Sequence, residues 1–343
     1  MQAVETVTAP TLTVKQSELK AAIAKVSKGV SGRSTLPILA NILLDADGEY
    51  LSLSATNLEI AITVVIPAYV ATPGKITIPA ALLSSFVAAL GPGQVSIAPL
   101  PQDVPGIRIQ GGTAAANMRG TDASEFPRIP YIDDAKPLFT LDAVVLRGAI
   151  HETAPCAATD ISHPVFTAIC THLTDTGIVF AASDTYRLAA RHVPLPEAGT
   201  GEEYLIPART LTTLTSILPD GEVTAYVTDK GQQVFFVAEG ITVVSHLLEG
   251  KYPNYEAILP AHHSTRVIAP RAALLDALRA TSVFDGDGTG TKTIKITVTP
   301  AESDLMPGTL TLDAKNDEFG DSEATVDATI DGPAITALYN SAY

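Results

Sequence analysis

The stretch LLEGKYPNYEAILP, residues 247–260, joins an apolar run, a glycine and an aromatic–proline pair to a second short apolar run that ends in proline. A less apolar stretch with a similar pattern, GTDASEFPRIP, ends at Pro130. Tyr252-Pro253 therefore repeats Phe126-Pro127 in a similar setting, 126 positions further along the chain. A recurrence over such a distance is typical of a duplicated structural unit.

Two further landmarks recur in the same order. SATNLEIAI returns as ASDTYRLAA, and its Ala55 and Ala182 are 127 positions apart. TIPAALLSSFVAAL returns as LIPARTLTTLTSIL, and its Pro79 and Pro207 are 128 positions apart. Three nearly equal offsets in one order predict a repeating unit of about 127 residues.

Each unit is expected to begin with a strand and a helix. In LTVKQSELKAAIAKVSKGV, apolar residues recur at helical spacing. They are Val14, Leu19, Ala22, Ile23 and Val26. FTLDAVVLRGAIHETAP and VIAPRAALLDALRATSVF open the second and third units with the same pattern, and Leu274, Leu275 and Leu278 form the apolar stripe of the last.

Strands and a second helix should follow in each unit. Alternating β-branched segments such as YLSLSATN, AITVVIPA and TKTIKITVTP predict strands. IPAALLSSF and IPARTLTTL place a proline just inside the start of a helix. DGPAITALYNSAY is expected to be their third counterpart, with Pro333 in the place of Pro79 and Pro207.

The pattern therefore predicts an α+β protein of three repeated domains, each with two helices packed on antiparallel sheet. The expected domains are residues 1–133, 134–260 and 261–343. The third is shorter than the others, and by the repeat about forty residues of strands are missing from it. We therefore expect the third domain to be incomplete.

Bulk composition agrees with several folded domains. The chain has 343 residues, of which 46% are hydrophobic and 17% are charged. No apolar run approaches the roughly 18 residues that a membrane-spanning helix needs. MQAVETVTAP lacks the basic start and apolar core of a secretory signal, so a cytoplasmic location is expected. Cys156 and Cys170 are interpreted as small apolar thiols, with a disulfide left open.

Charge is distributed unevenly along the chain. The net charge of −15 disfavours a protein that wraps nucleic acid in non-specific salt links. However, residues 1–33 contain five basic and two acidic residues, whereas residues 285–331 contain eleven acidic and three basic ones. We therefore expect the basic first domain of one chain to meet the acidic third domain of another, or else both ends to be ordinary solvated faces.

Sequence signatures of enzymes and metal sites were not found. HExxH, GxSxG and GxxxxGK are absent. GDGTGTK is glycine-rich, but its lysine does not directly follow the last glycine, and a calcium loop beginning at Asp285 would have Ile296 where a bidentate glutamate is needed. His262-His263 lies in a linker-like stretch. We expect no catalysis, no cofactor and no metal.

Taken together, several motifs resemble the bacterial sliding clamp, the β subunit of the replicative DNA polymerase III. These are GRSTLPILANILLDA, SATNLEIAI, ASDTYRLA, IPARTL and LLEGKYPNYEAILP, and the resemblance covers essentially the whole chain. It implies three clamp domains per chain, each closed by the aromatic–proline stretch, and a head-to-tail homodimer that forms a ring around duplex DNA. Such a ring is a processivity factor of DNA replication: it slides on DNA in the nucleoid, tethers the polymerase and catalyses nothing.

The resemblance also implies how the chain meets DNA. Basic residues on the helices that line the hole would contact phosphates weakly and without regard to base sequence. The candidates are Lys20, Lys25, Lys28, Arg33, Arg147, Arg209, Arg271 and Arg279. Arg33 matches the basic DNA-contacting residue of the family's GRxTLPIL loop, and each of the others is alternatively a solvated surface charge.

A peptide-binding cleft between the second and third domains is implied in the same way. It would receive short motifs from the polymerase, the clamp loader and repair proteins in an apolar, aromatic-rimmed groove. Its walls would be Phe166, Ser183, Thr185, Tyr186, Arg187, Leu188, Pro253 and Ile258. Thr185 stands where the family usually has glycine and Phe166 where it has a smaller aliphatic, so the cleft is expected to be narrowed or reshaped.

Two residues match hydrophobic positions of the family's dimer interface, Val283 and Phe284. The alternative to a clamp is a repeat-built scaffold that binds only protein and does not encircle DNA. A ring-closing dimer that loads on nicked or circular DNA would distinguish the two. Which polymerase or loader such a clamp would serve, and whether its source is a cell or a virus, are left open by these motifs.

Overall fold

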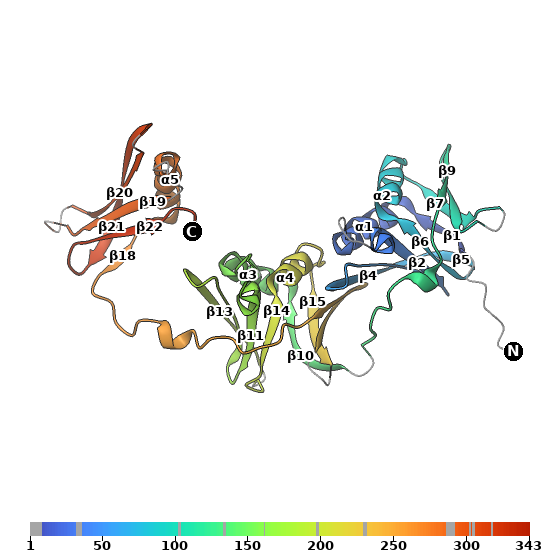
Figure 1. Cartoon of the computed structure of the whole chain (residues 1–343), viewed down its shortest axis with the longest axis horizontal. Coiled ribbons are helices and arrows are strands. Elements are labelled where there is room, and N and C mark those ends of the chain that lie inside the picture. The colour runs from blue at the N-terminus through green and yellow to red at the C-terminus, as the bar shows by residue number, and fades with distance from the viewer. Residues whose placement is uncertain are drawn as a thin grey trace. The chain divides into compact units, whose positions relative to one another are not determined.

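The protein is described by a computed structural model, shown in Figure 1. The described residues are 9–31, 36–101, 104–132, 135–160, 162–196, 199–228, 232–285, 292–301, 303, 306–316 and 318–343. The chain divides into two compact units, unit 1 (Met1–Pro253) and unit 2 (Asn254–Tyr343). Within the described residues, no helix has the length and apolar character that crossing a membrane requires.

Unit 1 begins with repeat one, which contains two helices and nine strands in its described part. In chain order these are β1 (Thr11–Lys15), α1 (Gln16–Val26), β2 (Asn41–Asp47), β3 (Tyr50–Thr56), β4 (Ile60–Pro67), β5 (Tyr69–Thr72), β6 (Gly74–Pro79), α2 (Ala80–Ala89), β7 (Gln94–Pro99), β8 (Gly106–Gly111) and β9 (Ala114–Arg119). Strands β5-β1-β7-β8-β9 form one antiparallel sheet. Strands β4-β3-β2-β6 belong to a second, larger sheet.

Repeat two has the same order of elements, apart from a counterpart of β5. They are β10 (Ala135–Asp142), α3 (Ala143–Thr153), β11 (Ala168–Thr174), β12 (Gly177–Ser183), β13 (Leu188–Pro194), β14 (Glu203–Pro207), α4 (Ala208–Thr215), β15 (Glu222–Thr228), β16 (Gln233–Ala238) and β17 (Ile241–His246). Strand β17 pairs antiparallel with β4 of repeat one, from Ile241 opposite Val64 to Ser245 opposite Ile60. The two repeats therefore share one eight-stranded sheet, β10-β15-β16-β17-β4-β3-β2-β6.

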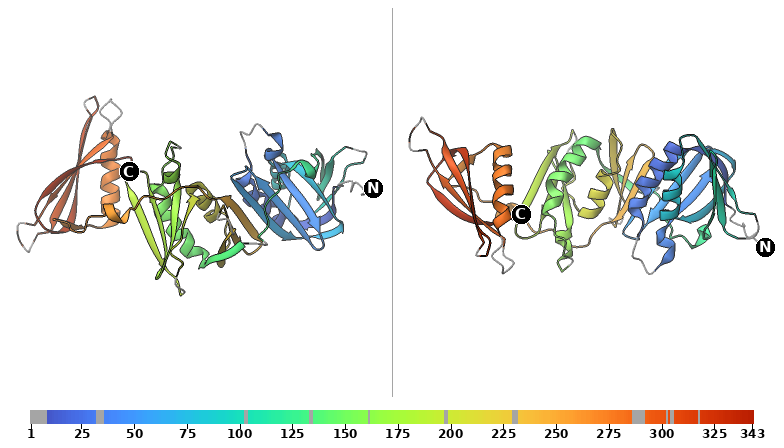
Figure 2. Two further views of the ribbon diagram at one scale, coloured as in Figure 1. Left: turned by 60° about the horizontal axis from the view of Figure 1, so that its bottom comes forward. Right: turned by 90° about the horizontal axis from the view of Figure 1, so that it is seen from above.

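The core of unit 1 lies between its helices and sheets. Leu19, Ala22, Ile23 and Val26 of α1 are all buried, which confirms the expected apolar face of that helix. Val14 is buried as well, but it belongs to β1 and not to the helix. Helix α1 packs against α2, and α3 against α4 (Figures 1 and 2). Each of the two repeats of unit 1 thus contains two helices packed on antiparallel sheet, as its sequence pattern predicts.

Unit 2 has a separate core. Its elements are β18 (Arg266–Ile268), α5 (Arg271–Thr281), β19 (Thr293–Thr299), β20 (Gly308–Asn316), β21 (Gly320–Asp331) and β22 (Ile335–Asn340). The strands form one antiparallel sheet in the order β18-β21-β20-β19-β22. Leu274 and Leu278 of α5 pack on buried Ile294, Leu312 and Val326 of this sheet.

The expectation of a second helix after Pro333 is wrong. Residues Ile335–Asn340 form strand β22, which pairs with β19 from Ile335 opposite Val298 to Asn340 opposite Thr293. In the same way β6 pairs with β2 and β14 with β11, so β22 is their counterpart. Pro79 and Pro207 end these strands and cap the following helices, whereas Pro333 precedes its strand. The proline match therefore assigned a helix to a segment that forms a strand.

Candidate peptide-binding surface

The hairpin loop between β12 and β13 is held by one carboxylate. The backbone N–H groups of Tyr186 and Arg187 both donate to Asp184 Oδ1, each at 3.0 Å. Arg187 Nε donates to Asp184 Oδ2, also at 3.0 Å. The backbone N–H of Thr185 donates to Ser183 Oγ at 3.1 Å. A loop with these four bonds presents its side chains in a fixed arrangement.

The electrostatics of Asp184 agree with this role. Its side chain is largely buried, and burial opposes ionisation. The N–H donors of Arg187 and Tyr186, together with the Arg187 guanidinium, nevertheless hold the pKa of Asp184 below its ordinary value. Above the loop, Tyr186 is 78% exposed, although the carboxylate fixes its backbone. An exposed aromatic on a fixed backbone is the form that a peptide-binding anchor takes.

Thr185 has a backbone conformation that β-branched residues rarely adopt, with φ of 77°. A glycine would adopt this conformation without strain. The same device occurs in repeat one, where Leu58 has φ of 75°. There Asn57 Oδ1 accepts from the N–H groups of Glu59 and Ile60 at 3.0 and 2.9 Å. Asn57 and Asp184 are thus equivalent loop anchors, and neither is among the residues that the sequence motifs predict.

Phe166 lies on the short 3₁₀ helix η5 (Pro164–Thr167) and is half-buried. Its ring makes an edge contact with Tyr252, with the centroids 6.1 Å apart and the planes at 72°. Tyr252 is 4% exposed, and Pro253, which follows it, is exposed. The buried tyrosine therefore fixes the end of unit 1 beside Phe166. Tyr252 is a supporting residue that the aromatic–proline pattern contained but that was not assigned a role.

The hairpin loop and the Phe166 segment are connected through the 3₁₀ helix η4 (Ala154–Cys156). The N–H of Ala158, just after η4, donates to the carbonyl of Phe166 at 2.8 Å. Burial raises the pKa of the Cys156 thiol, the nearby Arg187 charge lowers it and Asp184 raises it. These interactions place Cys156 close to both segments. Both cysteines are free, so the disulfide that was left open is not formed.

Within unit 1 the structure thus brings together predicted residues from separated stretches of the sequence. Leu188 starts β13 directly after the loop and is half-buried, and Ser183 ends β12 and is buried. Ile258 lies on the 3₁₀ helix η6 (Glu256–Ile258), is 70% exposed and belongs to unit 2. Its contribution to the same surface stays a prediction.

The predicted DNA-contacting residues lie on or beside helices, apart from Arg33, which is outside the described residues. Lys20 and Lys25 are on α1, and Lys28 is in the turn that follows it. Arg209 is on α4, and Arg271 and Arg279 are on α5. All of these are exposed except Lys25, which is half-buried. Contact with DNA remains a prediction for each of them.

Arg147 on α3 already has protein partners. Its guanidinium forms an ion pair with Asp220 and donates to the carbonyl of Leu218 at 3.2 Å. These contacts connect α3 to the turn that follows α4. Arg147 therefore has a structural role in unit 1, whether or not it also contacts DNA.

The two predicted interface residues differ in their surroundings. Val283 is 76% exposed, whereas Phe284 is half-buried and packs on the core of unit 2. Val283 is thus free to meet a partner surface, while Phe284 also supports its own domain. Among the described residues, no three His, Cys, Asp or Glu side chains are grouped as a metal site would require. The glycine-rich stretch 286–291 lies outside the described residues.

Comparison with known proteins identifies the family. Residues 11–130 match the family model described as DNA polymerase III beta subunit, N-terminal domain, and residues 140–254 match the central domain of the same subunit. The "Beta sliding clamp" of Synechocystis sp. is 30% identical over 97% of this chain and 88% of its own length, and that of Bacillus subtilis is 27% identical over 96% and 88%. The crystal structure of the Bacillus subtilis DNA polymerase sliding clamp superposes with a TM-score of 0.88 at 25% identity, covering 98% of this chain and 88% of that one. The chain therefore belongs to the bacterial β sliding clamps, the β subunits of DNA polymerase III.

Proposed function

We propose that the chain is the processivity factor of a replicative DNA polymerase. Two copies form a ring around duplex DNA, slide along it and tether the polymerase through the surface around Tyr186. The observation that carries the proposal is the pairing of β17 with β4, which extends one sheet across two repeats. We infer that the same edge-to-edge junction continues from one chain into the next.

The contact between two chains would repeat that junction. Ala114 and Ile241, the first residues of β9 and β17, are 127 positions apart, so β9 is the counterpart of β17. Strand β9 is the last strand of its sheet. Strand β21 is the counterpart of β4, because each is the third strand of its antiparallel series, β19-β20-β21 in unit 2 and β2-β3-β4 in repeat one. Strand β18 pairs with only the last three residues of β21. Strand β9 of one chain therefore pairs with β21 of a second, and the reciprocal contact closes a two-fold dimer.

Charge supports the same contact. Arg119 on β9 and Arg108 on the neighbouring β8 are exposed, as are Asp321 and Glu323 on β21. Opposite charges on the two edges would orient the approach of the chains and exclude the pairing of like edges. Val283 would add an apolar contact near this interface.

DNA would be held inside the ring by topology, with few and weak contacts. Exposed Lys20 and Lys28 would meet phosphates and carry no base specificity. The acidic net charge of the chain keeps most of its surface unattractive to DNA, which favours sliding over tight binding. The role is mechanical, so we propose a cytoplasmic protein of the nucleoid without catalytic activity.

The peptide-binding surface would take short motifs from the polymerase, the clamp loader and repair proteins. Tyr186 and Phe166 would provide its aromatic rim, Leu188 its apolar floor and Pro253 its far wall, with Ile258 joining from the third domain. The three domains retain the proposed boundaries 1–133, 134–260 and 261–343. The family matches to residues 11–130 and 140–254 support the first two of these.

The decisive experiment separates a ring from a scaffold. The purified chain is first weighed in solution, where a dimer is expected. It is then incubated with its clamp loader and ATP on nicked circular DNA and passed through a sizing column in high salt. A clamp stays with the circle and is lost once the circle is cut, because it slides off the ends. A protein that leaves the intact circle at high salt, or that stays on the linear DNA, is not a topological ring.

A further inference from the structure

The outer edge of β10 differs from its counterparts in the other repeats. In repeat one the corresponding strand, β1, is covered by β5, with Thr11 opposite Thr72 and Thr13 opposite Tyr69. In unit 2 the corresponding strand, β18, is covered by the end of β21. In repeat two β10 is the terminal strand of its sheet, and no strand of the described part of the chain pairs with its outer edge.

The segment after β13, which includes residues 199–202, occupies the chain position that β5 occupies after β4. In its described residues, its backbone forms hydrogen bonds with β11 and not with β10. The N–H groups of Gly199 and Gly201 donate to the carbonyls of Thr174 and Leu173 at 2.9 and 2.8 Å, and the N–H of Leu173 donates to the carbonyl of Glu202 at 3.0 Å. This segment therefore extends the sheet of β11 and β14. The seam between the edge strands β10 and β14 is left open.

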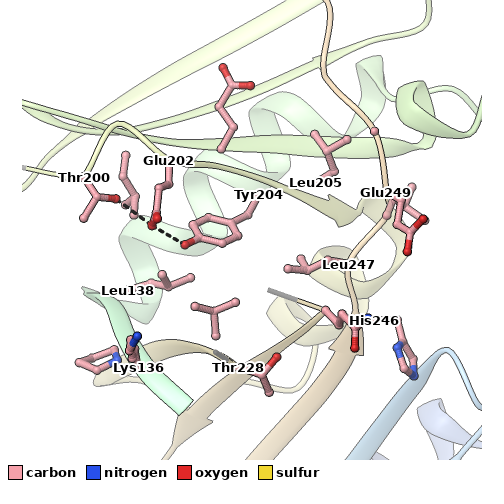
Figure 3. Close-up of a pocket in the computed structure, with 17 residues that line it drawn as sticks. Lys136, Leu138, Thr200, Glu202, Tyr204, Leu205, Thr228, His246, Leu247 and Glu249 are labelled. Atoms are coloured by element: carbon pink, nitrogen blue, oxygen red, sulfur yellow. Dashed lines mark hydrogen bonds between the residues drawn. The ribbon is translucent and has the colours of Figure 1, made fainter. Parts of the chain in front are cut away.

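A cavity of about 980 Å³ occupies this seam (Figure 3). Leu138 of β10, Tyr204 of β14 and Leu247 line it, and all three are half-buried. In repeat one, two backbone hydrogen bonds between Thr77 of β6 and Thr121, which follows β9, join the two sheets. In repeat two a single bond, from the N–H of Leu248 after β17 to the carbonyl of Leu205 on β14 at 2.9 Å, joins the corresponding segments.

The charge of the cavity wall is mainly acidic. Glu202, Glu203 and Glu249 line it, against Lys136 and His246. The Glu202 carboxylate accepts from Tyr204 Oη at 2.6 Å and Thr200 Oγ1 at 3.0 Å, as the dashed lines in Figure 3 show. These bonds lower the pKa of Glu202, so the carboxylate is ionised near neutral pH.

We propose that this seam is a strand-addition site, at which an extended peptide with alternating apolar residues and flanking lysine or arginine pairs with β10. The register follows from repeat one. Strands β1 and β10 both end directly before a helix, and counting back from that point places residues 138–140 opposite the added strand, as residues 11–13 lie opposite β5. Backbone bonds to the edge give affinity, Leu138 receives the apolar side chains, and the carboxylates receive the cations. The site is independent of the surface around Tyr186, and its test does not depend on ring formation.

The probe is a synthetic strand based on β5, KAYVATVK, titrated against the full chain. Backbone amides of residues 138–140 are followed by NMR, with hydrogen exchange in the free and bound states. We expect saturable binding, slowed exchange of the outward-facing amide in this segment and no change in β9. Leu138→Lys should weaken binding at least tenfold, and the pair Glu202→Gln and Glu203→Gln should weaken it several-fold. Leu82→Lys, an equally drastic change on the exposed face of α2, should leave it unchanged.

Several results would overturn the proposal. A scrambled peptide of the same composition that binds equally well would reduce the effect to charge attraction. Amides of residues 138–140 that are already fully protected in the free chain would mean that the chain covers its own edge. Absence of binding at millimolar peptide would also refute the strand-addition site. Because the exchange measurement uses the unmodified chain, the proposal stays open to refutation even if Leu138→Lys fails to fold.

Discussion

Replacement of Asp184 by alanine tests whether a prearranged hairpin loop creates the peptide-binding surface. The substitution removes the acceptor of three hydrogen bonds, two from the backbone N–H groups of Tyr186 and Arg187 and one from the Arg187 side chain. No apolar contact to a bound peptide is removed with it. Any loss of peptide affinity therefore reports on the order of the loop.

The size of the effect follows from the strain at Thr185. Its φ of 77° costs about 1–2 kcal/mol, which the bonds to Asp184 offset in the wild-type chain. Without them the relaxed loop is favoured by about this amount, so the competent loop is populated at roughly 3–15%. Peptide dissociation constants should then rise about 6- to 30-fold, because affinity falls with the competent fraction.

The assay is a fluorescence titration with an extended peptide that carries a glutamine and spaced leucine or phenylalanine anchors. The matched control is Asn57→Ala, which removes the equivalent anchor of the repeat-one hairpin beside Leu58. It should lower stability by a similar amount and leave the dissociation constant unchanged. If Asp184→Ala binds within about twofold of wild type while remaining folded, the loop is not prearranged by this carboxylate and the reasoning fails.

The same carboxylate predicts a dependence on pH. Because its folded-state pKa is lowered, ionised Asp184 adds stability that is fully present above its unfolded pKa, about 3.9, and is lost as the pH falls through its folded value. Asp184→Asn should therefore be less stable than wild type by a constant amount above about pH 5, and the difference should shrink below about pH 4. Urea unfolding across this pH range measures the stability difference between the two proteins. A difference that stays constant below about pH 4 would contradict the stabilising role of ionised Asp184.

Three further changes test other parts of the structure. Thr185→Gly should raise the free energy of unfolding by about 1 kcal/mol, since glycine removes the strain of a positive φ, and calorimetry that shows a loss would refute this. Val283→Glu should give folded monomers, measured by light scattering, because the Val283 side chain is 76% exposed. Phe284→Glu should also unfold the third domain, because Phe284 packs on its core. A Val283→Glu variant that stays dimeric would remove that residue from the interface. Lys20→Glu with Lys28→Glu should shorten the residence of loaded clamps on circular DNA at low salt without changing their oligomeric state, and an unchanged residence time would argue against contact with phosphates.

The sequence by itself determined the repeat and the order of its elements. Offsets of 126 to 128 positions and the apolar face of residues 19–26 are local, periodic signals that a chain displays without being folded. The motifs that carry the family resemblance are equally local, which is why membership in the β sliding clamps could be recognised before the fold was described. The repeat also matched the segment that contains Tyr186, ASDTYRLAA, to SATNLEIAI of the first unit.

Only the tertiary structure decided which edges pair and which side chains are engaged. ITALYN became a strand because β19 lies beside it, a contact between Thr293 and Asn340 that no local pattern encodes. Arg147 has the same sequence appearance as a free surface cation, and its partner Asp220 lies on a different element. The open edge of β10 likewise follows from which segments pair, whereas the loop around Thr185, with its positive φ, is held by local hydrogen bonds to Ser183 and Asp184. Helix and strand tendencies depend on nearby residues in the sequence, whereas pairing, burial and strain are properties of the assembled fold.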